Sequence, residues 1–551
     1  MTDKSFTNWT AMSDKALAGQ IGAFVRHHRL EQNKTQDTLS HEAGISRSTL
    51  SLLERGKTVT LATLIQVLRV LDQLQVMDVF AVEERISPLM LAKIQNEKRQ
   101  RARGKQGRET TEPDWQAMDV AEVRIWNELA GAVAWDNAAG LATLEYDPRF
   151  KAKGWDLAPL QMPISATRST FAFPDLRKKA SPRLDSFKGL PGLLADSLPD
   201  RYGNELINLW LAREGRPQNS MNPVEMLCFI GTRGIGALEF EPAVLKEGKR
   251  TFSVEVETLV ETAKNMLSKK ESFAANLDAD VNKVVSELLR IGTSAGGARP
   301  KAVIAYNEMT GEVRSGQTSA PRGFEHWLLK LDGVSDVQLG ASHGYGRVEM
   351  AYCNMARACG IIMMPSRLLE ENERAHFMTK RFDREGGSTK HHIQTFSALK
   401  HFDFNSVMSY SYEQLFQTMR ELKLPYPDAE QMFRRMTFNV AARNCDDHTK
   451  NFSFRLKQDA RWELAPAYDV CHAYQPNHQW VSQHALSING KRTNITKEDL
   501  LTVGNSVSVK KAAEIIDEVN TVVARWKQYA DDVAVSPRLR DQIAKTLIHL
   551  K

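Results

Sequence analysis

The segment RNCDDHTKNFSF (residues 443–454) places two adjacent carboxylates, a His, a Lys and an Asn directly before an apolar run. Asp446 and Asn451, five residues apart, supply groups that enzymes use to accept protons and to bind hard cations. Dense polar loops are also common on protein surfaces, and taken alone this segment is more typical of a solvated turn. Which of the two it is decides the fold of the C-terminal part of the chain, so the rest of the sequence has to distinguish them.

Two further segments carry charged residues in or after strand-like runs. In FEHWLLKLDG (324–333), Lys330 lies in an apolar strand pattern, where an unpaired ammonium is costly and needs an anionic partner such as a triphosphate. WELAPAYDV (462–470) ends a strand-like run at Asp469. A Lys in a strand, then Asp and Asn in a loop, then a further Asp is the order of groups used in phosphoryl transfer. The three segments together favour a nucleotide site.

A glycine-rich segment precedes all three. In LLRIGTSAGGARPKAVIAY (288–306), Gly296 and Gly297 separate a helical run from a β-like run that carries Lys301. Glycines let backbone N–H groups approach a phosphate closely. The segment matches neither a Walker A loop nor a GxGxxG loop, and alone it is more typical of a tight turn. Beside the other segments, it is interpreted as phosphate-binding.

Length and composition indicate a multidomain chain. With 551 residues it is too long for one hydrophobic core, and about three or four domains are expected. The first twenty residues lack the apolar region of a signal peptide, and no run approaches the roughly 18–20 apolar residues of a membrane span. We therefore expect a cytoplasmic protein without a membrane partner. The five cysteines form no CxxC pair, so reduced thiols are expected.

Positive charge is concentrated near the N-terminus. The chain has a net charge of +6, and residues 1–110 hold 17 Lys and Arg against 12 Asp and Glu. Much of this charge lies in KRQRARGKQGR (98–108). An ordinary solvated linker and a segment that contacts phosphate are both consistent with this run.

The first 80 residues predict a set of short helices. In TQDTLSHEAGISRSTLSLLERGK (35–57), Thr35 is placed to cap one helix and Gly44 to end it in the left-handed conformation. Ser46 caps the next helix after a turn of a few residues, and Thr60 begins another. Two helices joined by so short a turn form a helix-turn-helix. The alternative is a helical bundle that contacts only protein.

This region resembles the repressor-type helix-turn-helix of the Xre/Cro family over about residues 17–75, most specifically in GISRSTLSLLERGK (44–57). The resemblance implies that a helix beginning at Arg47 enters the major groove of operator DNA, and that the protein forms a homodimer to read two half-sites. By position, base edges would be contacted by Arg47 and Ser48, with Ser51 or Leu52 one turn on, and phosphates by Gln36, Arg55 and Lys57.

Residues 120–545 resemble the HipA family of bacterial serine/threonine kinase toxins. The matching segments occur in the family's order: GTSAGGARPKAVI, HWLLKL, KRFDRE, NCDDHTKNFSF and LAPAYDV. In that family the helix-turn-helix is usually a separate antitoxin, HipB, so the chain resembles a HipB–HipA fusion. The resemblance implies a protein kinase that uses ATP and Mg²⁺.

The resemblance also assigns roles by position. Asp446 corresponds to the catalytic base and Lys330 to the residue that pairs with the ATP phosphates. Asn451 and Asp469 correspond to the Mg²⁺ ligands, since their oxygens suit a hard cation.

Further residues of the motifs have roles that are less specific. His448 and Lys450 are assigned to the catalytic site, although each is equally compatible with a structural role, and Asp447 is expected to support the loop. The remaining ATP-binding residues implied by the resemblance are Ser294, Gly296, Gly297, Ala298, Lys301 and, in the hinge, Phe382.

The resemblance implies regulation and a target as well. Ser294 corresponds to an autophosphorylation site whose modification inactivates the kinase, and added negative charge beside a phosphate site gives a physical reason. The family's targets are aminoacyl-tRNA synthetases, chiefly the glutamyl enzyme, with growth arrest as the result. The alternative is a transcriptional regulator whose kinase-like body binds a nucleotide but transfers nothing.

The expected fold is multidomain: an all-α helix-turn-helix domain, then an α+β, kinase-like (HipA-type) two-lobed body with an all-α C-terminal lobe. The expected boundaries are residues 1–80 for the DNA-binding domain and 81–117 for a basic linker. Residues 118–385 would form the N-terminal region with the ATP-binding lobe, and 386–551 the helical lobe with the catalytic loop.

Overall fold

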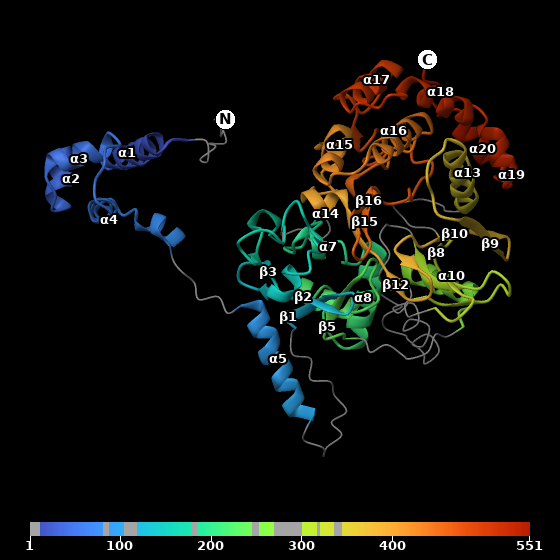
Figure 1. The fold of residues 1–551 in the computed structure, drawn as a ribbon, viewed down its shortest axis with the longest axis horizontal. Helices are drawn as coiled ribbons and strands as arrows, with labels where there is room; N and C mark the ends of the chain where they lie inside the picture. Colours follow the sequence, from blue (N-terminus) through green and yellow to red (C-terminus); the bar gives the residue numbers. More distant parts are fainter. Residues whose placement is uncertain are drawn as a thin grey trace. The chain divides into compact units, whose positions relative to one another are not determined.

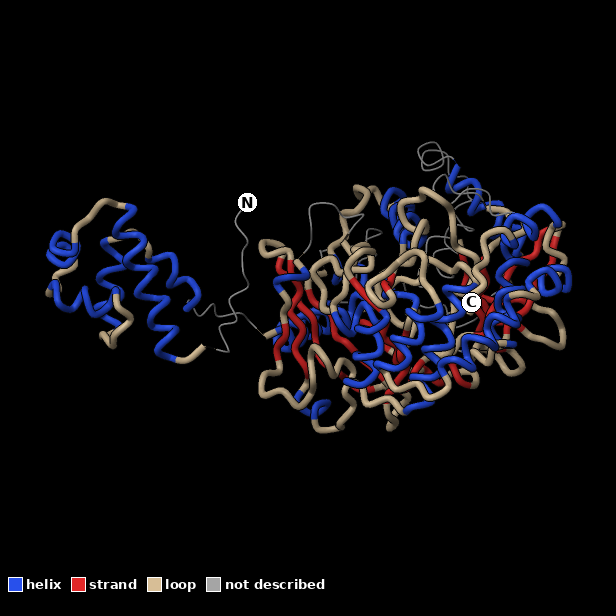
Figure 2. Tube along the Cα trace, turned by 90° about the horizontal axis from the view of Figure 1, so that it is seen from above, coloured by secondary structure: helices blue, strands red, loops and turns tan. Residues whose placement is uncertain are grey.

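The computed structural model describes residues 12–80, 87–103, 118–177, 185–244, 253–268, 300–316, 320–334 and 344–551. The chain divides into two compact units, Met1–Ile86 and Ser87–Lys551 (Figure 1). In Figure 2 the described part of the first unit is drawn only in the colours of helix and loop, whereas the second unit combines helices with strands.

The N-terminal unit is a helix-turn-helix domain. Its elements are α1 (Asp14–Glu31), α2 (Gln36–Glu42), α3 (Arg47–Glu54), α4 (Leu61–Val70) and the 3₁₀ helix η2 (Leu74–Phe80). The predicted caps Thr35 and Ser46 are confirmed, because each accepts a hydrogen bond from the backbone N–H three residues on. Thr60, predicted to begin a helix, caps α4 in the same way. Gly44 has a φ of 66°, the left-handed conformation that ends α2.

The core of this unit is small, and a buried ion pair lies beside it. The apolar side chains packed together in this core are Val25, Leu39, Ala43, Leu50, Leu53, Val67 and Leu71. Arg29 of α1 donates from Nε to Glu54 Oε1 of α3 over 2.5 Å and from Nη1 to the carbonyl of Lys34 over 2.8 Å. The pair joins the first helix to the second helix of the helix-turn-helix.

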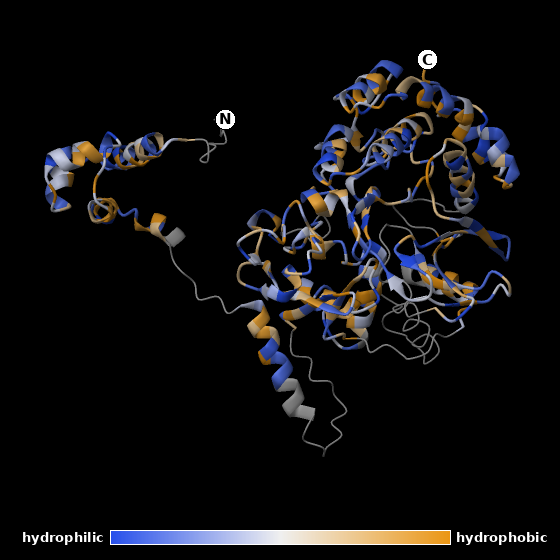
Figure 3. Cartoon of the chain, in the orientation of Figure 1, coloured by the Kyte–Doolittle hydropathy of each residue, from blue (hydrophilic) through white to orange (hydrophobic). Residues whose placement is uncertain are grey.

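The second unit begins with helix α5 (Pro88–Arg103) and an antiparallel sheet in the order β4-β3-β2-β1-β5. The strands are β1 (Val120–Ile125), β2 (Glu128–Asp136), β3 (Leu141–Tyr146), β4 (Thr170–Phe171) and β5 (Leu238–Glu241). The sequence predicts a linker over residues 81–117, but α5 forms inside this range and packs on β1, β2 and β3. Figure 3 shows the reason: α5 is hydrophobic near its start, where Ala92 is buried, and hydrophilic further on.

A group of short helices accompanies this sheet. They are α6 (Pro148–Lys151), η3 (Pro174–Leu176), α7 (Gly192–Ala195), α8 (Arg201–Arg213) and α9 (Pro223–Ile230). Helix α9 packs on β1, β2 and β5, and all eight of its residues are buried.

A second antiparallel sheet, in the order β7-β6-β8-β10-β9, holds part of the candidate site. Its strands are β6 (Lys301–Tyr306), β7 (Val313–Ser315), β8 (Glu325–Lys330), β9 (Ser366–Glu371) and β10 (Arg374–Lys380). Helix α10 (Val256–Ser268) adds Leu259 and Val260 to the core beneath it. Helix α13 (Tyr345–Ala358) packs on β9 and β10.

The C-terminal lobe is built mainly from helices, which lie together at one end of the second unit in Figure 1. They are α14 (Phe396–Lys400), α15 (Tyr412–Glu421), α16 (Tyr426–Ala441), η5 (Thr449–Asn451), α17 (Lys497–Ser506), α18 (Ala512–Val523), α19 (Trp526–Asp532) and α20 (Pro537–Ala544). The largest hydrophobic cluster of the described chain lies among them and reaches α13.

Short strands add to this lobe, which the sequence predicts as all-α. The order β13-β15-β16 joins His392–Thr395, Ser453–Leu456 and Trp462–Leu464, and small ribbons pair β11 (Arg384–Glu385) with β12 (Thr389–Lys390) and β14 (Tyr410–Ser411) with β17 (Leu486–Ser487). Strand β15 begins two residues after Asn451, so the apolar run after the polar segment anchors that segment to a sheet. Across the described ranges, no helix has both the length and the apolar character needed to cross a membrane.

Candidate functional site

The centre of the site is a lysine held between two carboxylates. Lys330, the last residue of β8, donates from Nζ to Glu349 Oε1 and to Asp469 Oδ1, each over 2.5 Å. Burial lowers the pKa of Lys330, but the two carboxylates outweigh this and hold the pKa well above its usual range. Burial raises the pKa of Asp469, and Lys330 and Lys301 outweigh it, so the pKa of Asp469 lies well below its usual range. Lys330 and Asp469 are therefore both charged at neutral pH.

Three different elements bring these groups together. Lys330 comes from a central strand, Glu349 from α13 behind the sheet, and Asp469 from the loop after β16. Asp469 has a φ of 56°, a left-handed conformation uncommon for a non-glycine residue. Such conformations occur often at functional sites.

Sequence reasoning missed Glu349. The residue lies among the apolar positions Val348, Ala351 and Tyr352 on the buried face of α13, and only 7% of its side chain is exposed. A carboxylate on the buried face of an amphipathic helix needs a cationic partner. That signal was present in the sequence, although it does not identify the partner.

A second lysine lies beside the first. Lys301 opens β6 and is the direct cross-strand partner of Lys330. Its Nζ lies 3.5 Å from Oδ2 of Asp200, whose side chain is buried and also caps α8. Burial raises the pKa of Asp200 to about 6, against the opposing effect of Lys301. The N-terminal part of the second unit thus supplies a carboxylate to the site, which the sequence did not indicate.

The polar segment 446–451 forms a compact loop. Asn451 donates from Nδ2 to the carbonyl of Asp446 over 2.6 Å, which leaves its Oδ1 for other contacts. His448 caps the 3₁₀ turn η5, and its Nε2 lies 3.8 Å from Oδ1 of Asp446. The Asp446 side chain is 46% exposed. Its carboxylate is accessible enough to meet a substrate from outside.

Asp447 differs from its neighbour Asp446 in burial. Its side chain is completely buried and accepts hydrogen bonds from the Tyr412 hydroxyl (2.8 Å), from His484 Nδ1 (2.8 Å) and from the Ala485 backbone N–H (2.7 Å). Burial lowers the pKa of His484, but the Asp447 carboxylate outweighs this and raises it to about 10. As the sequence suggested, Asp447 supports the loop.

Lys450 lies within the same loop. Its Nζ sits over the Phe404 ring at 4.6 Å from the centroid, and its backbone carbonyl accepts a hydrogen bond from the Tyr468 hydroxyl over 2.6 Å. Burial raises the pKa of the Asp196 carboxyl above its usual value, and the positive charge of Lys450 opposes this rise.

The segment around Phe382, between the two lobes, contains buried ion pairs. The Phe382 ring packs beside the Tyr468 ring at 5.5 Å between centroids, with the two planes tilted by 30°. On either side of it, Arg381 and Arg384 both pair with the buried Asp383, which also accepts a hydrogen bond from the Gly236 backbone N–H over 2.7 Å. Burial raises the pKa of Asp383, yet the two arginines outweigh it and hold the pKa far below its usual value.

A pocket lies between the loop and Asp469. Its lining includes Asn451, Tyr468 and Asp469, together with Asn444 and Phe438 behind the loop. To this lining Asn451 contributes an amide and Asp469 a carboxylate, and the oxygens of both suit Mg²⁺. Asn451 and Asp469 therefore fit the hard cation that the sequence suggested, and Lys330 and Lys301 fit the phosphates of a nucleotide.

Part of the predicted phosphate loop lies outside the described residues. This applies to Ser294, Gly296, Gly297 and Ala298. The described residues that the sequence assigned to catalysis, Mg²⁺ and ATP all lie in the second unit. They come from the ends of two interior strands of the second sheet, from the polar loop, from the segment around Phe382 and from the loop after β16.

The predicted DNA contacts lie in the other unit. Arg47 begins α3 and is 65% exposed, with Nε 3.4 Å from Asp37 Oδ1. Ser48, Arg55 and Lys57 are exposed and Ser51 is half-buried. Gln36 instead donates to Glu54 Oε2 over 2.7 Å, so it supports the fold of the domain as well as facing its surface.

Comparison with protein families gives three matches along the chain. The HipA N-terminal domain matches residues 121–241, the HipA-like C-terminal domain matches residues 293–526, and a helix-turn-helix domain matches residues 25–75. No curated protein sequence matches the chain.

Two solved structures are similar in fold. One is a chain of the toxin–antitoxin complex of HipA, HipB and operator DNA from Shewanella oneidensis MR-1, with 18% identity and a TM-score of 0.54 over 77% of this chain and 96% of that chain. The other is the Helicobacter pylori proinflammatory kinase CtkA, with 14% identity and a TM-score of 0.27 over 45% of this chain and 94% of that chain. The first similarity supports the fold of the second unit.

Proposed function

This chain belongs to the HipA family and carries a helix-turn-helix domain ahead of its HipA domains, and we propose that it is an ATP- and Mg²⁺-dependent protein serine/threonine kinase. The observation that carries the proposal is the placement of Lys330 between Glu349 and Asp469. Protein kinases need a strand Lys paired with a helix Glu, together with a metal-binding Asp.

Each side chain of the site has a separate role in phosphoryl transfer. Lys330 and Lys301 neutralise the phosphates of ATP, and Glu349 keeps Lys330 in place. Asp446 accepts the proton of the substrate hydroxyl as that oxygen attacks the γ-phosphorus. Mg²⁺ held by Asn451 and Asp469 would neutralise phosphate charge. Lys450 and His448 border the same site, where a cation stabilises charge on the transferred group.

The helix-turn-helix unit is proposed to bind operator DNA as a homodimer. Its exposed Arg47 and Ser48 at the start of α3 would meet base edges, and Arg55 and Lys57 would meet phosphates. The test is a mobility shift with the DNA upstream of the coding region, in a salt series. Arg47→Ala should weaken binding, with Arg26→Ala on α1 as an exposed control. Equal binding by both variants would refute the assignment.

The remaining proposals concern biology. The chain is proposed to act in the cytoplasm as the toxin of a toxin–antitoxin system, to phosphorylate an aminoacyl-tRNA synthetase such as the glutamyl enzyme, and so to arrest growth. Phosphorylation of Ser294 by the kinase itself would regulate it by adding negative charge next to the phosphate site.

Phosphate transfer from γ-labelled ATP tests the proposal. Purified protein is incubated with labelled ATP, Mg²⁺ and bacterial extract, and labelled proteins are hydrolysed to identify phosphoserine and phosphothreonine. Asp469→Asn should abolish the label, while Asp532→Asn, an exposed change of the same chemistry on α19, should leave it intact. Absence of label with wild type would favour a DNA-binding regulator that holds a nucleotide without transferring phosphate.

A further inference from the structure

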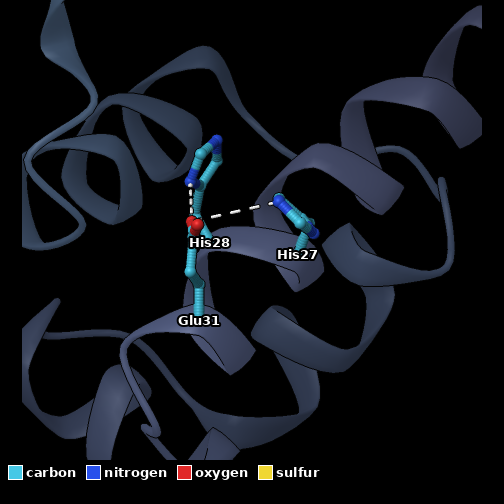
Figure 4. A group of neighbouring side chains, drawn as sticks. All are labelled: His27, His28 and Glu31. Carbon is cyan, nitrogen blue, oxygen red and sulfur yellow. Dashed lines mark hydrogen bonds and ion pairs between the residues drawn. The ribbon is translucent and has the colours of Figure 1, made fainter. Parts of the chain in front are cut away.

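Three potential metal ligands share one face of α1 in the helix-turn-helix unit: His27, His28 and Glu31 (Figure 4). Their ligand atoms lie within 4.8 Å of one another. Residues three and four apart on an α-helix are neighbours on its surface, which explains why both imidazoles reach Glu31. In the described part of the chain, no other group of three His, Cys, Asp or Glu side chains comes together in this way.

The distances between the Glu31 carboxylate and the two imidazole nitrogens are close to those between the ligand atoms of a bound metal ion. Glu31 Oε2 lies 3.0 Å from His28 Nδ1 and 3.9 Å from His27 Nε2. Two ligands of a tetrahedral Zn²⁺, each at about 2.0–2.1 Å from the ion, lie roughly 3.3 Å apart. Side-chain rotations alone can therefore bring the three atoms into coordination, without any movement of the helix.

The side chains around His27, His28 and Glu31 favour the binding of a metal ion. His28 is 21% exposed, and its ring packs edge-on against Phe24 at 4.5 Å between centroids, so one ligand is already held in place. His27 and Glu31 are 69% and 62% exposed, which leaves a path for the ion and room for a water ligand. The nearby charge of Arg29 is compensated by Glu54.

We propose that His27, His28 and Glu31 form a binding site for a transition-metal ion of the Zn²⁺ class. Two imidazoles and one carboxylate suit Zn²⁺, Ni²⁺ or Cu²⁺, whereas Mg²⁺ prefers oxygen ligands. Because α1 also carries Arg29, which pairs with Glu54 of α3, an ion that binds the folded helix stabilises the whole DNA-binding unit against unfolding. The site is independent of the kinase proposal.

Calorimetric titration of the untagged full-length protein with ZnCl₂ tests the site. Millimolar Mg²⁺ is included so that the region of Asp469 is occupied by the hard cation. His27→Ala and Glu31→Gln change exposed side chains, and each should weaken Zn²⁺ binding at least about tenfold. The matched control is His41→Ala, which removes an exposed imidazole from α2 of the same unit and should bind Zn²⁺ as wild type does.

Thermal unfolding gives a second readout. Zn²⁺ should raise the melting temperature of the helix-turn-helix unit in wild type and His41→Ala, and raise it less or not at all in the other two variants. Circular dichroism without metal verifies that the variants are folded; should His27→Ala be unfolded, the result rests on Glu31→Gln. Absence of Zn²⁺ binding by wild type, or equal affinity in Glu31→Gln and wild type, would overturn the proposal.

Discussion

Asp447→Asn should destabilise the second unit, because it removes the carboxylate that is paired with His484. The native carboxylate accepts three hydrogen bonds in a site without solvent exposure. An Asn side chain retains one oxygen, so at least one of the three donors then faces an NH₂ group. His484 loses its counter-charge and becomes neutral in the folded state.

The magnitude follows from the pKa of His484, which the structure raises from 6.5 to about 10. Because the folded pKa lies above the unfolded value, the pair stabilises the fold fully below pH 6.5 and loses its effect as the pH rises through 10. This difference corresponds to about 4 kcal/mol at pH 7 and to only about 1 kcal/mol at pH 9. A value of about 3–5 kcal/mol is also typical for the loss of one partner of a buried ion pair.

The assay is chemical denaturation of wild type and Asp447→Asn at pH 7 and at pH 9, with tryptophan fluorescence as the readout of unfolding. The gap in the free energy of unfolding should be large at pH 7 and smaller at pH 9. Asp446→Asn is the matched control, since its carboxylate is half-exposed and should leave stability within about 0.5 kcal/mol of wild type. Equal stability of Asp447→Asn and wild type at pH 7, or a gap that widens with pH, would refute the reasoning.

Three further changes test other contacts. Glu349→Gln leaves Lys330 paired with Asp469 alone, so the KM for ATP in phosphate transfer should rise about tenfold, whereas an unchanged KM would show that the pair does not position Lys330. Gly346→Ala would place a Cβ 1.9 Å from the Ala375 carbonyl oxygen and push α13 away from β10. Thermal unfolding should show that the free energy of unfolding falls by about 1–3 kcal/mol, and a melting curve like that of wild type would contradict the close packing. Glu54→Gln should destabilise the helix-turn-helix unit by about 3 kcal/mol in circular dichroism melts, with the exposed Glu42→Gln as control, and equal melts would argue against the Arg29 pair.

Local signals in the sequence were enough for the helix-turn-helix. A cap residue accepts its hydrogen bond from only three positions away, so Thr35, Ser46 and Thr60 could be located without tertiary information. Gly44 is similar, because a left-handed residue at a helix end depends on backbone geometry alone. Gln36 is the exception, since its contact with Glu54 comes from the way two helices pack.

The candidate active site was only partly predictable. Lys330 and Asp469 stand out as charges in or after strand patterns, and the loop 446–451 as a polar segment. Glu349 and Asp200 do not, because their partners are set by how α13 and α8 pack on the second sheet rather than by nearby sequence. Helix α5 was missed for a related reason: its apolar start is short and gains stability only against the first sheet.

The central claim is that Asp446 is the base of a kinase that binds ATP between Lys330 and Asp469. The most direct measurement compares phosphate incorporated per mole of protein by wild type and Asp446→Asn, at MgATP concentrations where calorimetry shows both to be saturated. The account predicts equal MgATP affinity and at least about a hundredfold less incorporation by Asp446→Asn. Equal incorporation by the two proteins, or none by wild type with MgATP bound, would contradict it.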